Sequence, residues 1–191
     1  AAQSLFYLYL KEKDFDDAEN QLKMLPTEVV AYNAMKPKLQ LQRGQLKEAY
    51  ISGEKLLSTG LSAVSLVLNV LTKVGIADHQ LETAKRYADM SQKIDNLIPI
   101  TNPFTFESQL KIAEASDDPG QAVTILKELL ANIIDQPQPA ILQHLTLVKP
   151  KKTTAPAEAR RQLLQIFTAD PEMAFLQKSP SFQQLLHEYN L

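Results

Sequence analysis

The chain has 191 residues, 45% of which are hydrophobic, and a formal net charge of -2. This length is sufficient to bury a core as one domain or one short solenoid, and the nearly balanced charge argues against a dedicated nucleic-acid surface, which would be basic. Because the chain contains no cysteine, disulfides and thiolate metal sites are excluded, and a reducing compartment is compatible with the sequence.

No membrane span and no leader are predicted. The longest apolar runs, such as residues 61–71, are shorter than the roughly 18 residues of a membrane span and contain polar residues. The first residues, AAQSLFYLYL, have no basic leader and no cleavage-site context. We therefore expect a cytoplasmic protein without membrane contact. Since a helix is already under way at Ala2 and no methionine initiates the chain, we also expect an upstream segment in the intact protein.

Apolar residues recur with helical spacing from the N-terminus onward. Residues 2–11 predict one helix and residues 14–25 a second, with Asp14 as its N-cap and Pro26 as its stop. The two helices predict a first hairpin.

The next hairpin turns at a glycine. Residues 28–43 predict its first helix, in which Pro37 should cause a kink or a break because proline lacks a backbone N–H. Gly44 closes that helix, and residues 46–58 form the second one.

Two glycines frame the most apolar helix of the chain. Gly60 is expected to cap the preceding helix, Ser62 to start the apolar one and Gly75 to end it. Its apolar residues lie nearly all round, which is typical of a helix buried on most sides. Three further helices are predicted at residues 80–94, 104–115 and 119–134.

A small residue stands at one equivalent place in each second helix. These residues are Ala18, Ala49, Ala84 and Ala122, separated by 31, 35 and 38 positions. The spacings bracket the roughly 34-residue unit of the tetratricopeptide repeat and lie below the ~40–47 of HEAT or armadillo units. The Gly44 turn and the repeated alanine resemble tetratricopeptide repeats, although the chain has no tryptophan and Pro37 occupies a position that is usually small.

The resemblance implies an all-α fold, a tetratricopeptide-like right-handed superhelix of about four helical hairpins with a C-terminal helical cap. We expect the repeats over residues 1–135 and the capping segment over residues 136–191, packed together as one continuous domain.

Past residue 135 the repeat signal fades. Residues 140–148 predict a short helix, and KPKKTTAPAE has the composition of a mobile loop. Three short helices follow, begun by Pro156, by Asp170-Pro171 and by Ser179-Pro180. Eight apolar side chains of this tail are available to cover the last hairpin: Leu163, Ile166, Phe167, Phe175, Leu176, Phe182, Leu185 and Leu186.

The order of several motifs resembles the C-terminal region of helix-turn-helix regulators of the xenobiotic-response-element type in Gram-positive bacteria. The motifs are GQLKEAY, AVTILKELL, ILQHLTLVK, AEARRQLLQIF and AFLQKSPSFQQLL. In such regulators the DNA-binding module lies upstream, so the resemblance implies that this chain senses a peptide or holds a dimer and meets DNA only through an upstream domain.

Catalytic chemistry is not predicted. His79, His144 and His187 lie in different segments without the spacing of a helical zinc site, and phosphate-binding and nucleophile motifs are missing. The neighbouring carboxylates, Asp16 with Asp17 and Asp117 with Asp118, precede helices and are explained as caps. We expect no enzyme, no catalytic or metal-binding residue and no cofactor.

The basic concentration near the tail consists of Lys149, Lys151, Lys152, Arg160 and Arg161. Without interleaved aromatic residues for base stacking, a solvated loop is the favoured interpretation over phosphate contact.

A peptide groove is predicted from the first helices of successive repeats. Alignment on Gly44 places six residues there: Lys38, Leu41, Asn69, Lys73, Glu107 and Lys111. Ammonium groups attract carboxylates, asparagine can pair with a peptide backbone, and a carboxylate-ended peptide is the expected ligand. The alternative is a solvated groove whose lysines only maintain solubility.

The N-terminal helix is too apolar to face water as a solenoid end. We expect Leu5, Phe6 and Tyr9 to form a homodimer contact or to meet an upstream helix.

Three functions follow in order of preference. The first is a peptide- or protein-binding sensory and dimerisation part of a bacterial regulator, the second a free-standing scaffold or co-chaperone adaptor, and the third an enzyme without a visible motif.

Overall fold

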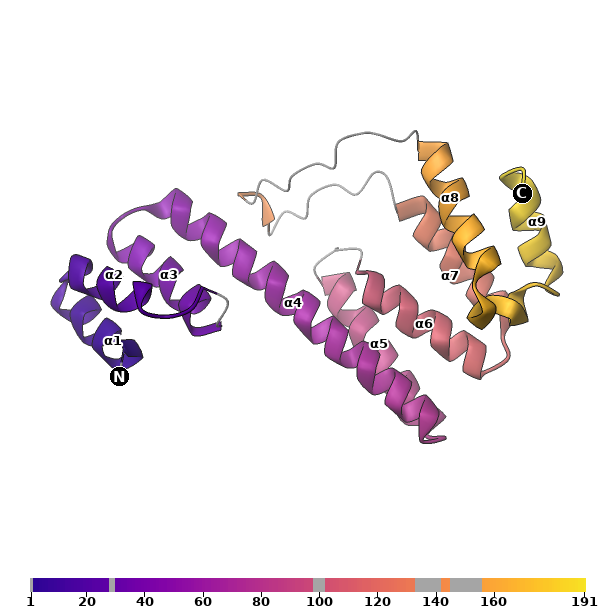
Figure 1. The fold of residues 1–191 in the computed structure, drawn as a ribbon, viewed down its shortest axis with the longest axis horizontal. Coiled ribbons are helices and arrows are strands. Elements are labelled where there is room, and N and C mark those ends of the chain that lie inside the picture. The colour runs from indigo at the N-terminus through magenta and orange to yellow at the C-terminus, as the bar shows by residue number, and fades with distance from the viewer. Residues whose placement is uncertain (1, 28–29, 98–101, 133–141, 145–155) are drawn as a thin grey trace. The chain divides into compact units, whose positions relative to one another are not determined.

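The computed structural model of the chain describes residues 2–27, 30–97, 102–132, 142–144 and 156–191. These residues form helices and no strand, which confirms the all-α class (Figure 1). The elements are α1 (Ala2–Glu12), α2 (Phe15–Lys23), α3 (Val30–Gln42), α4 (Leu46–Ala77), α5 (Leu81–Leu97), α6 (Pro103–Ala115), α7 (Pro119–Asn132), α8 (Pro156–Ala169), the 3₁₀ helix η2 (Pro171–Leu176) and α9 (Pro180–Glu188).

The helices group into two compact units. Unit 1 comprises Ala1–Leu61 with Ala140–Leu147, and unit 2 comprises Ser62–Pro139 with Val148–Leu191. The expected division at residue 135 differs from this grouping, because α4 continues through residue 61 and contributes to both units.

Four hairpin turns share one backbone geometry. Lys13, Gly44, His79 and Asp117 all have positive φ, at 62°, 73°, 57° and 50°. In every case the next residue donates its N–H to the carbonyl oxygen five residues earlier, for example Gln45 to Gln40 at 2.9 Å. This pattern is the Schellman closure of a helix C-terminus. The same turn geometry therefore recurs four times among the described residues, although only one of the four turns contains glycine.

The alanines of the repeat follow these turns at a constant distance of five positions. Each donates its N–H to the residue after the turn, as Ala18 does to Asp14 at 3.0 Å. Ala18, Ala84 and Ala122 are completely buried, while Ala49 is half-buried. A methyl group at this position allows the two helices of a hairpin to approach closely.

The glycines of α4 do not end helices, contrary to the prediction. Gly60 and Gly75 both lie inside the single helix Leu46–Ala77, and neither has positive φ. One glycine in a helix costs only about 1 kcal/mol, which the packing of a long apolar helix can offset. At Gly75 an added Cβ would stand 3.0 Å from the Cβ of Ala84, so this glycine permits the contact between α4 and α5.

The predicted break at Pro37 is also absent. Pro37 lies within α3, which runs from Val30 to Gln42.

Unit 1 has its core between the first three helices. Its buried side chains come from α1, α2 and α3: Phe6, Ala18, Leu22, Met35 and Leu39. Asp14 caps α2 by accepting the N–H of Asp17 at 3.2 Å, as predicted.

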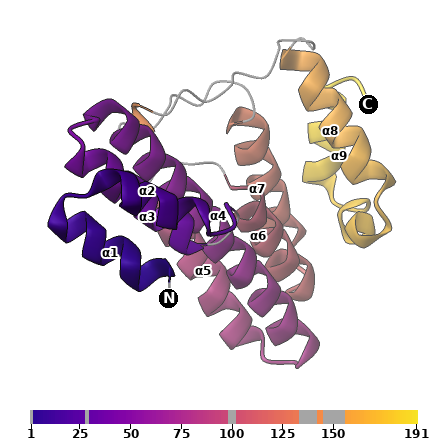
Figure 2. The ribbon, with the colours of Figure 1, turned by 60° about the vertical axis from the view of Figure 1, so that its left-hand side comes forward.

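Unit 2 has its largest core under the C-terminal helices. α5 and α6 lie side by side in both views, and α6 packs on α7 (Figures 1 and 2). The tail contributes Leu164, Met173, Leu176, Phe182, Leu185 and Leu186 to a cluster with Leu110, Ala113, Ala122, Val123, Ile125, Leu126 and Leu130. We expected Ile166 among the tail side chains that cover the last hairpin, but it is 64% exposed.

Candidate peptide-binding surfaces

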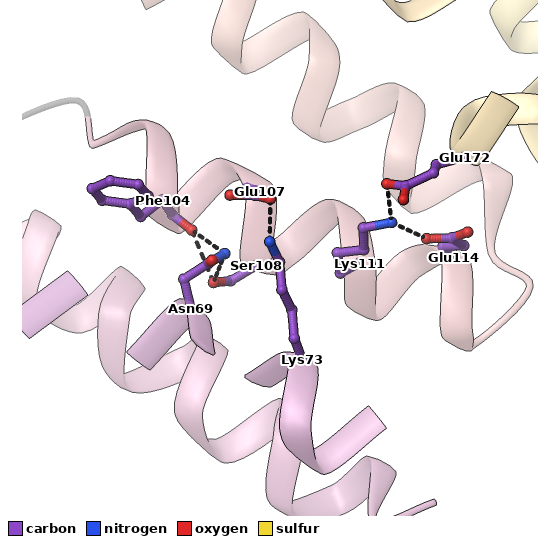
Figure 3. Close-up of polar contacts among 8 residues, drawn as sticks. All are labelled: Asn69, Lys73, Phe104, Glu107, Ser108, Lys111, Glu114 and Glu172. Atoms are coloured by element: carbon purple, nitrogen blue, oxygen red, sulfur yellow. Dashed lines mark hydrogen bonds and ion pairs between the residues drawn. The ribbon is translucent and has the colours of Figure 1, made fainter. Parts of the chain in front are cut away.

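Asn69 does not face a groove, contrary to the prediction. It is 2% exposed, and its Nδ2 donates to the carbonyl oxygen of Phe104 at 3.2 Å and to Ser108 Oγ at 3.1 Å (Figure 3). The asparagine thus satisfies buried acceptors of α6, which is a reason for its presence that does not require a ligand.

The two lysines predicted beside Asn69 are paired within unit 2. Lys73 on α4 forms an ion pair with Glu107 on α6, both about half exposed. Lys111 on α6 bonds Glu114 at 2.9 Å and Glu172 of η2 at 2.7 Å (Figure 3). Because each ammonium group already has a carboxylate, a peptide carboxylate would have to displace it.

The Lys111 cluster links the hairpin α6–α7 to the tail. Burial by itself would lower the pKa of Lys111, but the hydrogen bonds that it donates to Glu172 and Glu114 outweigh burial and raise the pKa above its ordinary value. The same hydrogen bond to Lys111 lowers the pKa of Glu172. Both shifts favour the ion pair between Lys111 and Glu172, which joins α6 to η2.

Lys38 and Leu41 belong to unit 1. Lys38 Nζ lies 3.3 Å from the hydroxyl oxygen of Tyr7 and 5.0 Å from the centre of its ring. Leu41 is 56% exposed. Leu41 is thus exposed at the surface of α3, and its role in a groove stays a prediction, while the Lys38 ammonium contacts an aromatic ring of α1.

The predicted dimer residues of α1 divide between surface and core. Leu5 is 38% exposed and Tyr9 is partly buried against the unit 1 core, but Phe6 is completely buried. The prediction that Phe6 lies on a dimer surface is therefore wrong, because α2 and α3 already cover it.

An open groove of about 410 Å³ lies in unit 1 along α2, α3 and the start of α4. Leu22, Leu39 and Tyr32 supply its apolar lining. Lys23 and Lys36 are exposed at it. Lys23 pairs with Glu19 at 3.2 Å, and the carboxylates of Glu19 and Glu48 also line the groove. Lys36 is the lining lysine that has no carboxylate partner among the described residues.

Gln40 lines the same groove with an unsatisfied oxygen. Its Oε1 is buried and has no hydrogen-bond partner among the residues that the structure describes. A buried carbonyl oxygen without a donor is unfavourable by roughly 1–3 kcal/mol, so a ligand N–H that reached it would be bound favourably.

Arg43 forms one wall of the groove and is fixed in place. Its guanidinium donates to Glu19 at 2.6 Å, to Asp16 at 3.0 Å and to the carbonyl oxygen of Phe15 at 2.9 Å. Hydrogen bonding to Arg43, and then to Lys23, lowers the pKa of Glu19. Arg43 thus joins α3 to α2 and does not offer a free charge.

A second contact in unit 1 holds a short remote segment of the chain on α4. Leu142 is 2% exposed, and the backbone N–H of His144 donates to Glu54 Oε2 at 2.9 Å. His144 Nδ1 meets Glu54 Oε1, and the imidazole stacks on Tyr50 with ring centres 4.3 Å apart and planes inclined by 11°. α4 therefore contacts a backbone amide and a ring of this segment, in which the neighbouring Leu142 is buried.

Sequence analysis did not identify Tyr50, Glu54 or Gln40. Tyr50 and Glu54 stand four positions apart on one helix face, a spacing that could have indicated a shared contact. Nothing in the sequence indicates that His144, 90 positions away, meets them.

Other predicted features have simple outcomes. Within the part of the chain that the structure describes, no group of three His, Asp or Glu side chains could hold a metal ion. Asp118 caps α7 through Gln121, and Arg160 donates to the carbonyl oxygen of Leu130 at 2.8 Å. Lys149, Lys151, Lys152 and most of residues 140–148 lie outside the described residues.

No family model matches the chain, and no curated protein and no solved structure matches it either. The resemblances to tetratricopeptide repeats and to regulators of the xenobiotic-response-element type therefore remain hypotheses.

Proposed function

We propose that this chain is a non-catalytic, peptide-binding helical repeat domain whose four hairpins belong to a tetratricopeptide-like superhelix. The observation that carries the proposal is the groove of unit 1, in which the buried Gln40 Oε1 has no donor.

The groove chemistry favours a short acidic or carboxylate-ended peptide. Leu22 and Leu39 line the groove but are each only 4% exposed, so the partly exposed Tyr32 offers the apolar contact, and a peptide N–H is the donor that Gln40 Oε1 lacks. Lys36 has no carboxylate partner among the described residues, so its ammonium group can meet a ligand carboxylate. An exposed pair of this kind contributes only about 0.2–1 kcal/mol, so affinity must come mainly from apolar burial and charge must set the orientation.

The contact of α4 with His144 supports the proposal. It shows how this unit holds a peptide segment: a carboxylate receives the backbone N–H, an aromatic ring stacks, and a leucine is buried.

The proposal is tested by fluorescence anisotropy with two labelled peptides of alternating leucine and charge, one with glutamate and one with lysine. We expect the glutamate peptide to bind more tightly. Lys36→Glu should weaken its binding roughly two- to thirtyfold, since an attraction is replaced by a repulsion of similar size. Gln40→Leu should also weaken it, because the acceptor is lost.

Lys127→Glu on α7 is the matched control, since Lys127 is also exposed but lies in unit 2. Equal binding of both peptides, or an equal loss in the Lys127 variant, would reject the groove as the site.

The cellular context rests on the motif resemblance alone. We propose that the domain is the sensory and dimerisation part of a cytoplasmic bacterial regulator. The gene sequence upstream of the Ala1 codon tests this: a helix-turn-helix there supports a regulator, and a different module there favours the scaffold or co-chaperone alternative.

A further inference from the structure

The unit 2 part of α4 carries an exposed apolar stripe that its own fold does not use. Ala63, Val67, Val70, Val74 and Ala77 follow one another at spacings of four, three, four and three, and we call this set the valine seam. The three valines are 57%, 50% and 55% exposed. Val64 and Leu66, at 45% and 43%, widen it.

The opposite face of the same helix is buried. Ser65, Leu68, Asn69 and Thr72 are 0–6% exposed, and Gly75 contacts Ala84 of α5. α4 is therefore apolar on two faces, of which the fold of unit 2 covers one. A contiguous row of exposed apolar side chains along one helix marks an interaction surface.

We propose that the valine seam binds the valine seam of a second copy of this chain, as a parallel helix pair. Alternating spacings of three and four are the heptad pattern of two-stranded coiled coils, with Val67 and Val74 at the a positions and Val70 at d. β-Branched residues at a favour two strands, and the small Ala63 and Ala77 allow close approach. The inference goes beyond peptide binding and does not depend on it.

Charge complementarity selects the parallel orientation. In a parallel pair the g position of one helix lies beside the e position five residues further along the other. Leu66 thus meets Leu71, and Lys73 meets Asp78, each twice in a symmetric dimer. Lys73 is 44% exposed and already pairs with Glu107 of its own chain, so Asp78 of the second copy would share that ammonium group; no ion pair of Asp78 is found within the described residues.

A membrane is the competing occupant of the seam. α4 is the one helix among the described residues that is long and apolar enough to cross a membrane by length and composition. A crossing would remove the bonds of Asn69 and Lys73 to α6 and place their polar groups in lipid. The second copy is favoured because it leaves these bonds intact.

Sedimentation equilibrium of the full chain tests the pairing. We expect a monomer–dimer equilibrium, and the double variant Val67→Glu, Val70→Glu should raise its Kd at least about tenfold, because charges would be buried in the contact. Met90→Glu on α5, 52% exposed and off the seam, should leave the Kd unchanged. Circular dichroism checks that each variant stays folded.

Orientation is tested with single cysteines, since the chain has none of its own. In a parallel pair, identical a residues face each other, so Val67→Cys and Val74→Cys should each give disulfide-linked dimers under mild oxidation. Met90→Cys should give none above background.

Three results would overturn the proposal. They are a strictly monomeric chain over the whole concentration range, a dimer whose Kd the double glutamate variant leaves unchanged, and cross-linking at only one of Val67 and Val74. Monomeric chain that binds phosphatidylcholine vesicles, with loss of binding in the double variant, would assign the seam to a membrane instead.

Discussion

Glu54 binds His144 through both of its carboxylate oxygens, one taking the backbone N–H at 2.9 Å and the other meeting Nδ1. Glu54 is 8% exposed, and the two residues are separated by 90 positions. A buried carboxylate needs such partners, since an unpaired charge in the interior is strongly unfavourable. The contact therefore ties the Leu142–His144 segment to α4.

His144→Ala should weaken this contact while leaving the rest of unit 1 intact. Losing the stacked ring and a charge-assisted hydrogen bond should destabilise the docked segment by about 1–3 kcal/mol. Hydrogen exchange of the backbone amides of Leu142–His144 measures this loss of stability. Gln143→Ala is the control, since Gln143 is exposed, and equal protection in both variants would contradict the role of His144.

Gly75→Ala and Gly60→Ala should change stability in opposite directions, although both lie inside α4. At Gly75 the new Cβ would stand 3.0 Å from Ala84 Cβ and 3.1 Å from its backbone nitrogen, so overpacking should destabilise by about 1–3 kcal/mol. At Gly60 no atom lies within 4 Å, and alanine should stabilise the helix by about 0.5–1 kcal/mol. Thermal unfolding measures the melting temperature of each variant. A change of the same sign in both melting temperatures would refute this account of α4.

The Glu19–Arg43 pair should make unit 1 sensitive to acid. Because hydrogen bonding to Arg43 lowers the pKa of Glu19 below its ordinary value of 4.5, the folded state binds fewer protons than the unfolded state in that range. The stabilisation is present above pH 4.5 and is lost as the pH falls through the lowered pKa. Glu19→Gln should thus melt below the wild type at pH 7 and approach it in acid. A constant difference at all pH values would be inconsistent with the ion pair.

Asp95 should have the opposite pH dependence. Burial raises its pKa, although hydrogen bonds from Thr105 and the Asn102 backbone lower it in part. The folded state then binds more protons, so this group favours folding increasingly as the pH falls from neutral toward 3.8. Asp95→Asn should equal or exceed the wild-type melting temperature at pH 7 and lose that advantage near pH 4. A lower melting temperature at pH 7 would mean that the ionised carboxylate stabilises the fold.

Local patterns in the sequence predicted the helices, their turns and several of their ends. The alanines at 18, 84 and 122 and the cap at Asp14 were predicted and found, because helix periodicity and capping depend on neighbours within about five positions. The turns at His79 and Asp117 were harder to predict, since αL residues other than glycine lack a strong local signal.

Which small and polar residues are buried depends on contacts between helices that lie far apart in the sequence. Gly75 could have ended a helix, and the position of Ala84 makes it a contact between helices instead. Asn69 could have faced a ligand, and the acceptors of Phe104 and Ser108 turn it inward. Phe6 is likewise buried because α2 and α3 pack over it. Each outcome depends on partners far away in the chain, where the periodicity of a single helix carries no information.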